Sequence, residues 1–169
     1  MRNTKHTLVC LSACLALAVA IADQAIDSSV FQLRLVADTG SEAPTSSRVE
    51  RMNLVNINNA NGRTNQETLY IEKAVLLDGH DLKDTHVVTD TLTKQAEIAF
   101  ELSAAGQKRF AEVTRQHIGK RLAIVIDGQV CSAPVIQSEI TGGKGQISGN
   151  FTQEQARELS NKINRALKK

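Results

Sequence analysis

A glycine-rich stretch at residues 136–151 contains the residue types that could bind a phosphate group. It places four glycines around Lys144 and runs into a helix start at Thr152. A phosphate-binding P-loop requires Gly-Lys-Ser/Thr directly before the helix, so that the lysine and the hydroxyl reach phosphate and magnesium. Here Gly145 follows the lysine, and Gly149 comes one residue too late for the Rossmann pattern. The stretch therefore predicts a glycine turn, and no nucleotide as ligand.

Ionisable and nucleophilic side chains do not have the spacing of a catalytic or metal site. The histidines beyond residue 22 are scattered, with no partner at ligand spacing. Cys131 lies in an alternating pattern that favours a small packed side chain over a nucleophile. Asp81 and Asp84 beside His80 fit turn and cap chemistry. We therefore expect no catalytic residue, no metal and no cofactor, and we predict that the protein is not an enzyme.

The elements that must position the glycine stretch are mostly strands. Apolar alternation or continuous apolar runs predict strands at residues 31–37, 69–77, 85–90, 96–102, 121–127 and 130–132. Asp127-Gly128 predicts a hairpin turn between the last two. Residues 38–66 lack a sustained apolar period and are predicted to form mainly a surface loop, with a short helix or strand at 48–57.

Two helices complete the predicted fold. Ser103 is placed to cap the first, which is expected to end at Gly119. Thr152 and Gln155 form a capping box for the second, whose apolar stripe needs a sheet face to pack against. Residues 146–148 are predicted as a short edge strand. The fold class is therefore α+β, with a mixed, mostly antiparallel sheet and two main helices packed on it.

The first 22 residues have the features of a targeting segment. A short basic start precedes an apolar run that ends in overlapping small-x-small sites, which predicts a cleaved signal peptide at residues 1–22 and a mature domain at 23–169. Two alternatives stay open: an uncleaved membrane anchor, or lipidation at Cys14, which lies in a lipobox-like Leu-Ser-Ala-Cys. We expect a periplasmic or otherwise exported protein, with membrane attachment only through such an anchor or lipid.

The charge balance of the mature chain excludes one class of partner. Of the 20 basic residues, Arg2 and Lys5 lie in the targeting segment, and the remaining 18 equal the 18 acidic residues in number. Nucleic-acid binding needs a basic surface, which a near-neutral domain does not predict. Cys131 would be the only mature cysteine, so no internal disulfide is expected.

Several ordered segments resemble the head subdomain of the first large periplasmic domain of SecD, an accessory of the Sec protein-export channel. The resemblance covers roughly residues 31–167 and is carried by segments 76–79, 81–84, 100–106, 119–128, 132–137 and 140–152. It implies an α+β unit on the outer side of the membrane, which contacts emerging polypeptide and swings during export. The sequence shows no multi-span membrane region, so the resemblance implies the fold rather than the translocase activity.

Two functions follow as expectations. The first is an exported binding module for unfolded or extended polypeptide, possessing an apolar groove beside the glycine stretch and an open strand edge. The second is a scaffolding subunit of an envelope complex unrelated to translocation, marked by a contiguous apolar patch. The predicted binding residues are Gly142, Gly143, Lys144, Gly145, Gln146 and Ser148.

Overall fold

The computed structural model describes residues 28–38, 47–58 and 63–168. The predicted signal peptide and Cys14 lie outside these residues. Along the described chain the elements are η1 (Ser28–Val30), β1 (Phe31–Val36), β2 (Val49–Asn58), β3 (Arg63–Asp78), η2 (Gly79–Asp81), β4 (Leu82–Thr89), β5 (Ala96–Leu102), α1 (Ala104–Gln116), β6 (Leu122–Ile126), β7 (Gln129–Ser132), β8 (Lys144–Phe151) and α2 (Gln153–Leu167). The predicted α+β class is confirmed.

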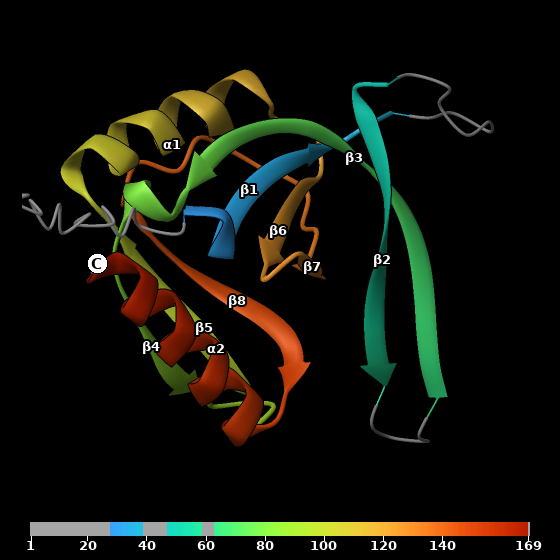
Figure 1. The fold of residues 1–169 in the computed structure, drawn as a ribbon, viewed down its shortest axis with the longest axis vertical. Helices are drawn as coiled ribbons and strands as arrows, with labels where there is room; N and C mark the ends of the chain where they lie inside the picture. Colours follow the sequence, from blue (N-terminus) through green and yellow to red (C-terminus); the bar gives the residue numbers. More distant parts are fainter. Residues whose placement is uncertain (1–27, 39–46, 59–62, 169) are drawn as a thin grey trace, which may run out of the picture.

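The strands divide between two sheets. Five of them form a closed barrel in the order β1-β3-β2-β7-β6, and β4, β5 and β8 form a separate three-stranded sheet. All pairings are antiparallel except that of β2 with β7, which is parallel and has one registered pair, Leu54 with Val130. Figure 1 shows the β2–β3 hairpin along one side of the molecule and α2 against the three-stranded sheet on the other.

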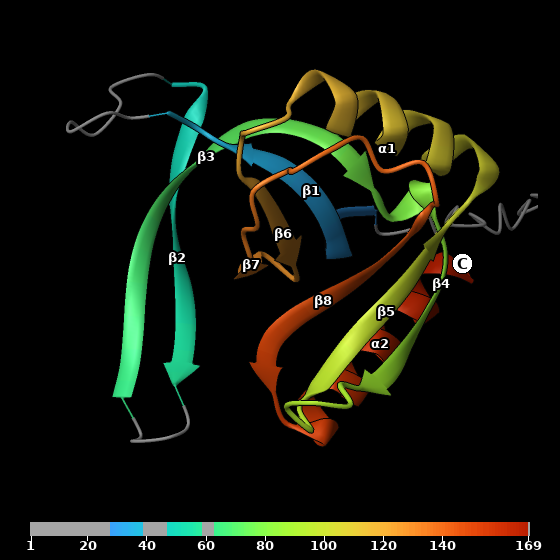
Figure 2. The ribbon, with the colours of Figure 1, turned by 180° about the vertical axis from the view of Figure 1, so that it is seen from behind.

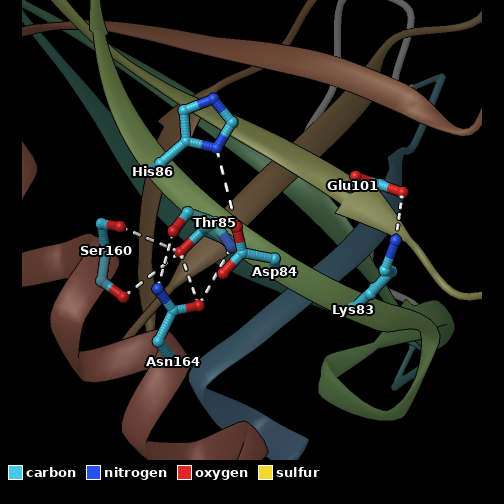
Figure 3. Close-up of polar contacts among 7 residues, drawn as sticks. All are labelled: Lys83, Asp84, Thr85, His86, Glu101, Ser160 and Asn164. Atoms are coloured by element: carbon cyan, nitrogen blue, oxygen red, sulfur yellow. Dashed lines mark hydrogen bonds and ion pairs between the residues drawn. The ribbon is translucent and has the colours of Figure 1, made fainter.

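Helix α2 is attached to β4 by side-chain hydrogen bonds as well as apolar packing. Thr85 is buried in β4, and its hydroxyl lies 3.0 Å from the hydroxyl of Ser160. The amide of Asn164 donates to the carbonyl of Thr85 at 2.6 Å, and its oxygen accepts from the Thr85 amide at 3.0 Å. Figure 3 shows these contacts together with the Lys83–Glu101 and Asp84–His86 pairs on the outer face of the sheet. Helix α2 thereby covers the outer edge of β4 at Thr85.

A mostly aliphatic core lies between the barrel, the three-stranded sheet and the two helices. Phe31, Ile98 and Ile147 are fully buried there, and the rings of Phe31 and Phe100 are 5.9 Å apart. A second, smaller cluster fills the barrel and includes Ile71, which is also fully buried. The apolar stripe of α2 faces the first cluster as predicted, through Ala156, Leu159, Ile163 and Leu167.

Residues 38–66 were predicted mainly as a loop, and this is wrong for the described part beyond residue 48. Residues 49–58 and 63–66 are strand, and β2 pairs with β3 at ten registered positions. Backbone hydrogen bonds hold this hairpin, and they do not depend on an apolar period in the side chains. The short element that was expected at 48–57 as a helix or a strand is a strand, β2.

The helix and turn predictions are confirmed with small shifts. The hydroxyl of Ser103 accepts from the amide of Gly106 at the start of α1, and Thr152 with Gln155 caps α2. α1 ends at Gln116, before Gly119, whose φ is +83°. β4 begins at Leu82 rather than at Thr85, because the predicted turn element is confined to η2.

A candidate apolar groove beside strand β8

The glycine stretch is only partly the turn that the sequence predicted. From residue 144 onward it is strand β8, an edge strand that pairs with β5. The predicted edge strand is therefore confirmed and is longer than expected. Figure 2 shows β8 running past the end of the β6–β7 hairpin.

Two glycines of β8 make room for aromatic rings instead of turning the chain. A Cβ on Gly145 would lie 2.4 Å from the ring tip of Phe100, and one on Gly149 would lie 2.3 Å from the ring of Phe151. A Cβ tolerates neither distance, so glycine lets the backbone of β8 lie directly against these rings. The sequence predicted a turn, and at these two positions the structure instead shows the backbone in close approach to a ring.

The loop before β8 contains the one glycine of the stretch that needs a left-handed backbone. Gly143 has φ +63° and is buried against the side chain of Gln107 in α1. Gly142 has no positive φ, and a Cβ there would meet open space. Of these two glycines only Gly143 therefore has a backbone conformation that favours glycine.

A cavity of about 290 Å³ opens beside the first residues of β8. Its floor consists of buried apolar side chains from β1, β5, α1 and β6: Leu33, Phe100, Phe110, Leu122 and Ile124. One wall is the loop that follows β7, including Val135 and Ile140, which are 45% and 38% exposed. The opposite wall is the start of β8. We call this cavity the β8 groove.

Hydrogen bonds hold the loop wall of the β8 groove in place. The carbonyl and amide of Ile136 bond with the backbone at Gly119 and Lys120. The buried hydroxyl of Thr114 in α1 accepts from the amide of Ile140 at 2.9 Å. Gln107 donates to the Thr141 carbonyl at 2.5 Å. A fixed wall presents its exposed apolar side chains at low entropic cost on binding.

The predicted binding residues divide into three groups. Lys144, Gly145 and Gln146 line the β8 groove. Gly142 and Gly143 precede it, and neither lines it. Ser148 lies further along β8, where it donates to Glu97 at 2.7 Å on the exposed surface. Sequence reasoning missed the residues of the apolar floor and of the loop wall, although Val135 and Ile140, in a stretch without regular structure, were a visible signal of the wall.

Charges near the β8 groove are paired. Glu101 in β5 is opposite Lys144 in the register and bonds with Lys83 at 2.7 Å. The hydrogen bond from Lys83 holds the pKa of Glu101 below its ordinary value, and the charge of Lys144 adds to this more weakly. Glu101 raises the pKa of Lys83 in turn. Of these three charged residues only Lys144 lines the groove, and the Glu101 carboxylate lies between it and Lys83 on the outer face of the sheet.

The other groups considered for chemistry have structural roles. Asp81 is buried, caps η2 by accepting from the amide of Asp78, and bonds with Arg109 at 3.0 Å. Burial raises the pKa of the Cys131 thiol to about 11, so it is protonated near neutral pH. Among the described residues no three histidine, cysteine or acidic side chains converge as metal ligands. No helix in the described part of the chain has the length and hydropathy to cross a membrane.

The fold and the groove define an α+β domain with an open apolar groove beside an edge strand. The model of the family described as "SecDF, P1 head subdomain" matches residues 54–167. The chain belongs to this family, and it is thus a domain of a protein-export family. The resemblance found in the sequence is confirmed.

Individual relatives agree with this assignment. The protein translocase subunit SecD of Sebaldella termitidis is 54% identical over 86 residues, which cover 51% of this chain and 21% of the relative. SecD of Aquifex aeolicus is 47% identical over 98 residues, or 58% of this chain and 19% of the relative. The chain thus spans about a fifth of the length of these relatives.

Solved structures agree as well. One described as "Structure and function of a membrane component SecDF that enhances protein export" has 30% identity and a TM-score of 0.61, over 80% of this chain and 61% of that one. The structure of SecDF in a super-membrane-facing form has 30% identity and a TM-score of 0.59, over 80% of this chain and 18% of that one.

Proposed function

We propose that this chain is an exported, non-enzymatic domain that binds unfolded or extended polypeptide in the β8 groove as part of protein export. The observation that carries the proposal is the apolar cavity beside an edge strand. An extended peptide can add to such an edge through main-chain hydrogen bonds while its alternate side chains enter a neighbouring pocket. Neither contact needs a particular peptide sequence, which suits a domain that meets many polypeptides.

The family supports polypeptide as the ligand. A solved relative is described as a membrane component that enhances protein export. A domain that contacts a chain during export needs a site for segments that have not yet folded, and such segments expose apolar side chains and unpaired strand edges. The proposed location is the periplasm or another exported compartment, with an uncleaved anchor or a lipidated Cys14 as the alternative modes of membrane attachment.

The scaffolding alternative requires a contiguous apolar patch outside the groove. Among the described residues the exposed large apolar side chains outside the groove are Val75, Leu92 and Ile118. They lie on β3, on the turn after β4 and after α1, respectively. The groove, with its floor of buried apolar side chains, remains the site that the geometry favours.

Binding of a permanently unfolded, fluorescently labelled polypeptide tests the proposal. Ile140→Asp places a charge on the groove wall and should weaken binding about tenfold or more, since central apolar contacts contribute over 1.4 kcal/mol each. Leu92→Asp is the matched control, because Leu92 is 90% exposed and does not line the groove. Equal affinities for the two variants, both folded, would rule out the β8 groove as the site.

A further inference from the structure

Val135 forms the border between the β8 groove and a second cavity. The second cavity has a volume of about 500 Å³ and lies where β1 ends and β6 begins, at one end of the barrel. Val135 lines both cavities, and it is 45% exposed. An extended chain that lies across the Val135 side chain can therefore contact both cavities at once. We call the second cavity the barrel-end cavity.

The main-chain groups of Val135 are free to bind such a chain. Val135 pairs with Arg121 in an isolated antiparallel bridge, and the hydrogen bonds of this bridge are made by the residues on either side, at 2.8 and 2.9 Å. In a pair of this type the amide and carbonyl of the central residue point away from the partner strand. Neither group of Val135 bonds with another described residue. An extended polypeptide can therefore form strand-type hydrogen bonds with Val135.

The lining of the barrel-end cavity is more highly charged than that of the β8 groove. Its charged residues are Asp38, Glu67, Lys120 and Arg121, whereas Lys144 is the one charged residue among those described that line the groove. Arg121 donates to the carboxylate of Glu67 at 2.5 and 3.2 Å, and Lys120 pairs with Asp38. The hydrogen bond from Arg121 holds the pKa of Glu67 below its ordinary value. Two cations thus balance two anions, and the lining has no net charge.

We propose that the polypeptide in the β8 groove continues past Val135 into the barrel-end cavity, so that the site binds a boundary between an apolar and a polar segment. This inference rests on the proposed function and names the class of segment that is bound. The apolar part lies in the groove, the main chain bonds with Val135, and the polar part lies against the two ion pairs. Because the charges of the lining balance, the polar part is bound whether it is acidic or basic.

Fluorescence anisotropy with two kinds of labelled peptide tests the inference. The core peptide has about six apolar residues and spans about 20 Å when extended, so it measures binding in the groove. Extended peptides carry a further polar segment at the amino or at the carboxyl end, so that both chain directions are sampled. One of the two extensions should lower the Kd about tenfold, as expected for two added hydrogen bonds. Acidic and basic versions of that extension should bind equally well.

A charge reversal in the barrel-end cavity should create a preference between these two versions. Glu67→Lys changes the lining to three cations and one anion, so the acidic extension should bind about threefold more tightly than the basic one. Glu112→Lys is the matched control, because Glu112 also pairs with an arginine but lines neither cavity. In the control variant the two versions should still bind equally.

The failure of this inference differs from the failure of the proposed function. If the core peptide binds but neither extension lowers the Kd, the groove binds polypeptide and the inference is wrong. A preference of the parent for one sign of charge, or the same preference in both lysine variants when both are folded by circular dichroism, would also refute it. If the core peptide does not bind, the proposed function fails and the inference fails with it.

Discussion

The three-stranded sheet ends in β4 on one side and in β8 on the other, and the two edges have different surroundings. At β4, the side chain of Asn164 bonds with both backbone polar groups of Thr85 (Figure 3). At β8, the first residues line an apolar groove with a fixed loop wall. An exposed strand edge is a template for pairing with another chain, and proteins usually cover it. Here a helix covers one edge, and the other lies beside a cavity for apolar side chains.

The difference shows how one small sheet can have a covered edge, at β4, and an edge placed to bind another chain, at β8. α2 packs mainly on β4 and also carries Asn164, whose side chain occupies the backbone polar groups of that edge at Thr85. β8 instead contains glycines, which bring its backbone against Phe100 in the floor of the groove. The glycines that suggested a turn in the sequence therefore bring the backbone of β8 close to the apolar floor of the groove.

The largest expected effect comes from opening the closed edge. Asn164→Ala removes three hydrogen bonds to Thr85 and should lower the free energy of unfolding by about 2–4 kcal/mol, because buried polar groups of Thr85 lose their partners. Asn161→Ala, exposed on the same helix, should change it by less than about 0.5 kcal/mol. Denaturant unfolding measures both, and equal midpoints would show that Asn164 does not close the edge of β4.

A smaller effect is expected in the loop that leads into β8. Gly143→Ala should lower the free energy of unfolding by about 1–3 kcal/mol, since alanine is strained at φ +63° and crowds Gln107. Gly142→Ala has open space and should change it by less than about 0.5 kcal/mol. Thermal melts of the two variants measure this difference, and the Gly143 variant should melt at a lower temperature than the Gly142 variant. A melt of the Gly143 variant that matches the parent would contradict the left-handed turn before β8.

The smallest effect concerns charge on the outer face of the sheet. The pKa of Glu101 is lowered, so its carboxylate stabilises the fold above its unfolded-state pKa, and this contribution is lost as the pH falls through the folded-state value. Lys83→Met should raise the pKa of Glu101 more than Lys144→Met, because the hydrogen bond from Lys83 is the larger cause. NMR titration of the Glu101 carboxyl carbon measures both. A larger shift in the Lys144 variant would reverse this ranking.

Local signals in the sequence predicted much of the fold. The strand at 96–102 alternates in burial along its whole length, and the run at 122–126 is buried throughout, as its continuous apolar pattern indicated. The caps at Ser103 and Thr152 depend on neighbouring residues alone. Elements of this kind are fixed by short-range chemistry, so a single sequence is enough to predict them.

What could not be predicted depends on contacts between distant residues. The β2–β3 hairpin is held by backbone pairing that leaves little trace in its polar sequence. The floor of the β8 groove combines Leu33, Phe100 and Ile124 from three strands far apart in the chain, and nothing local brings them together. The glycine stretch was correctly singled out, but its partners are aromatic rings set by the strand register, and the register is a tertiary property.

Amide hydrogen exchange in the presence of a saturating unfolded polypeptide tests the central claim most directly. The account predicts slower exchange for the backbone amides of β8 that point away from β5. The exchange rates of β4 amides should not change. A bound peptide that forms a strand on β8 must supply those hydrogen bonds. Protection in β4, or binding that leaves the exchange of β8 amides unchanged, would contradict the assignment of the open edge as the binding site.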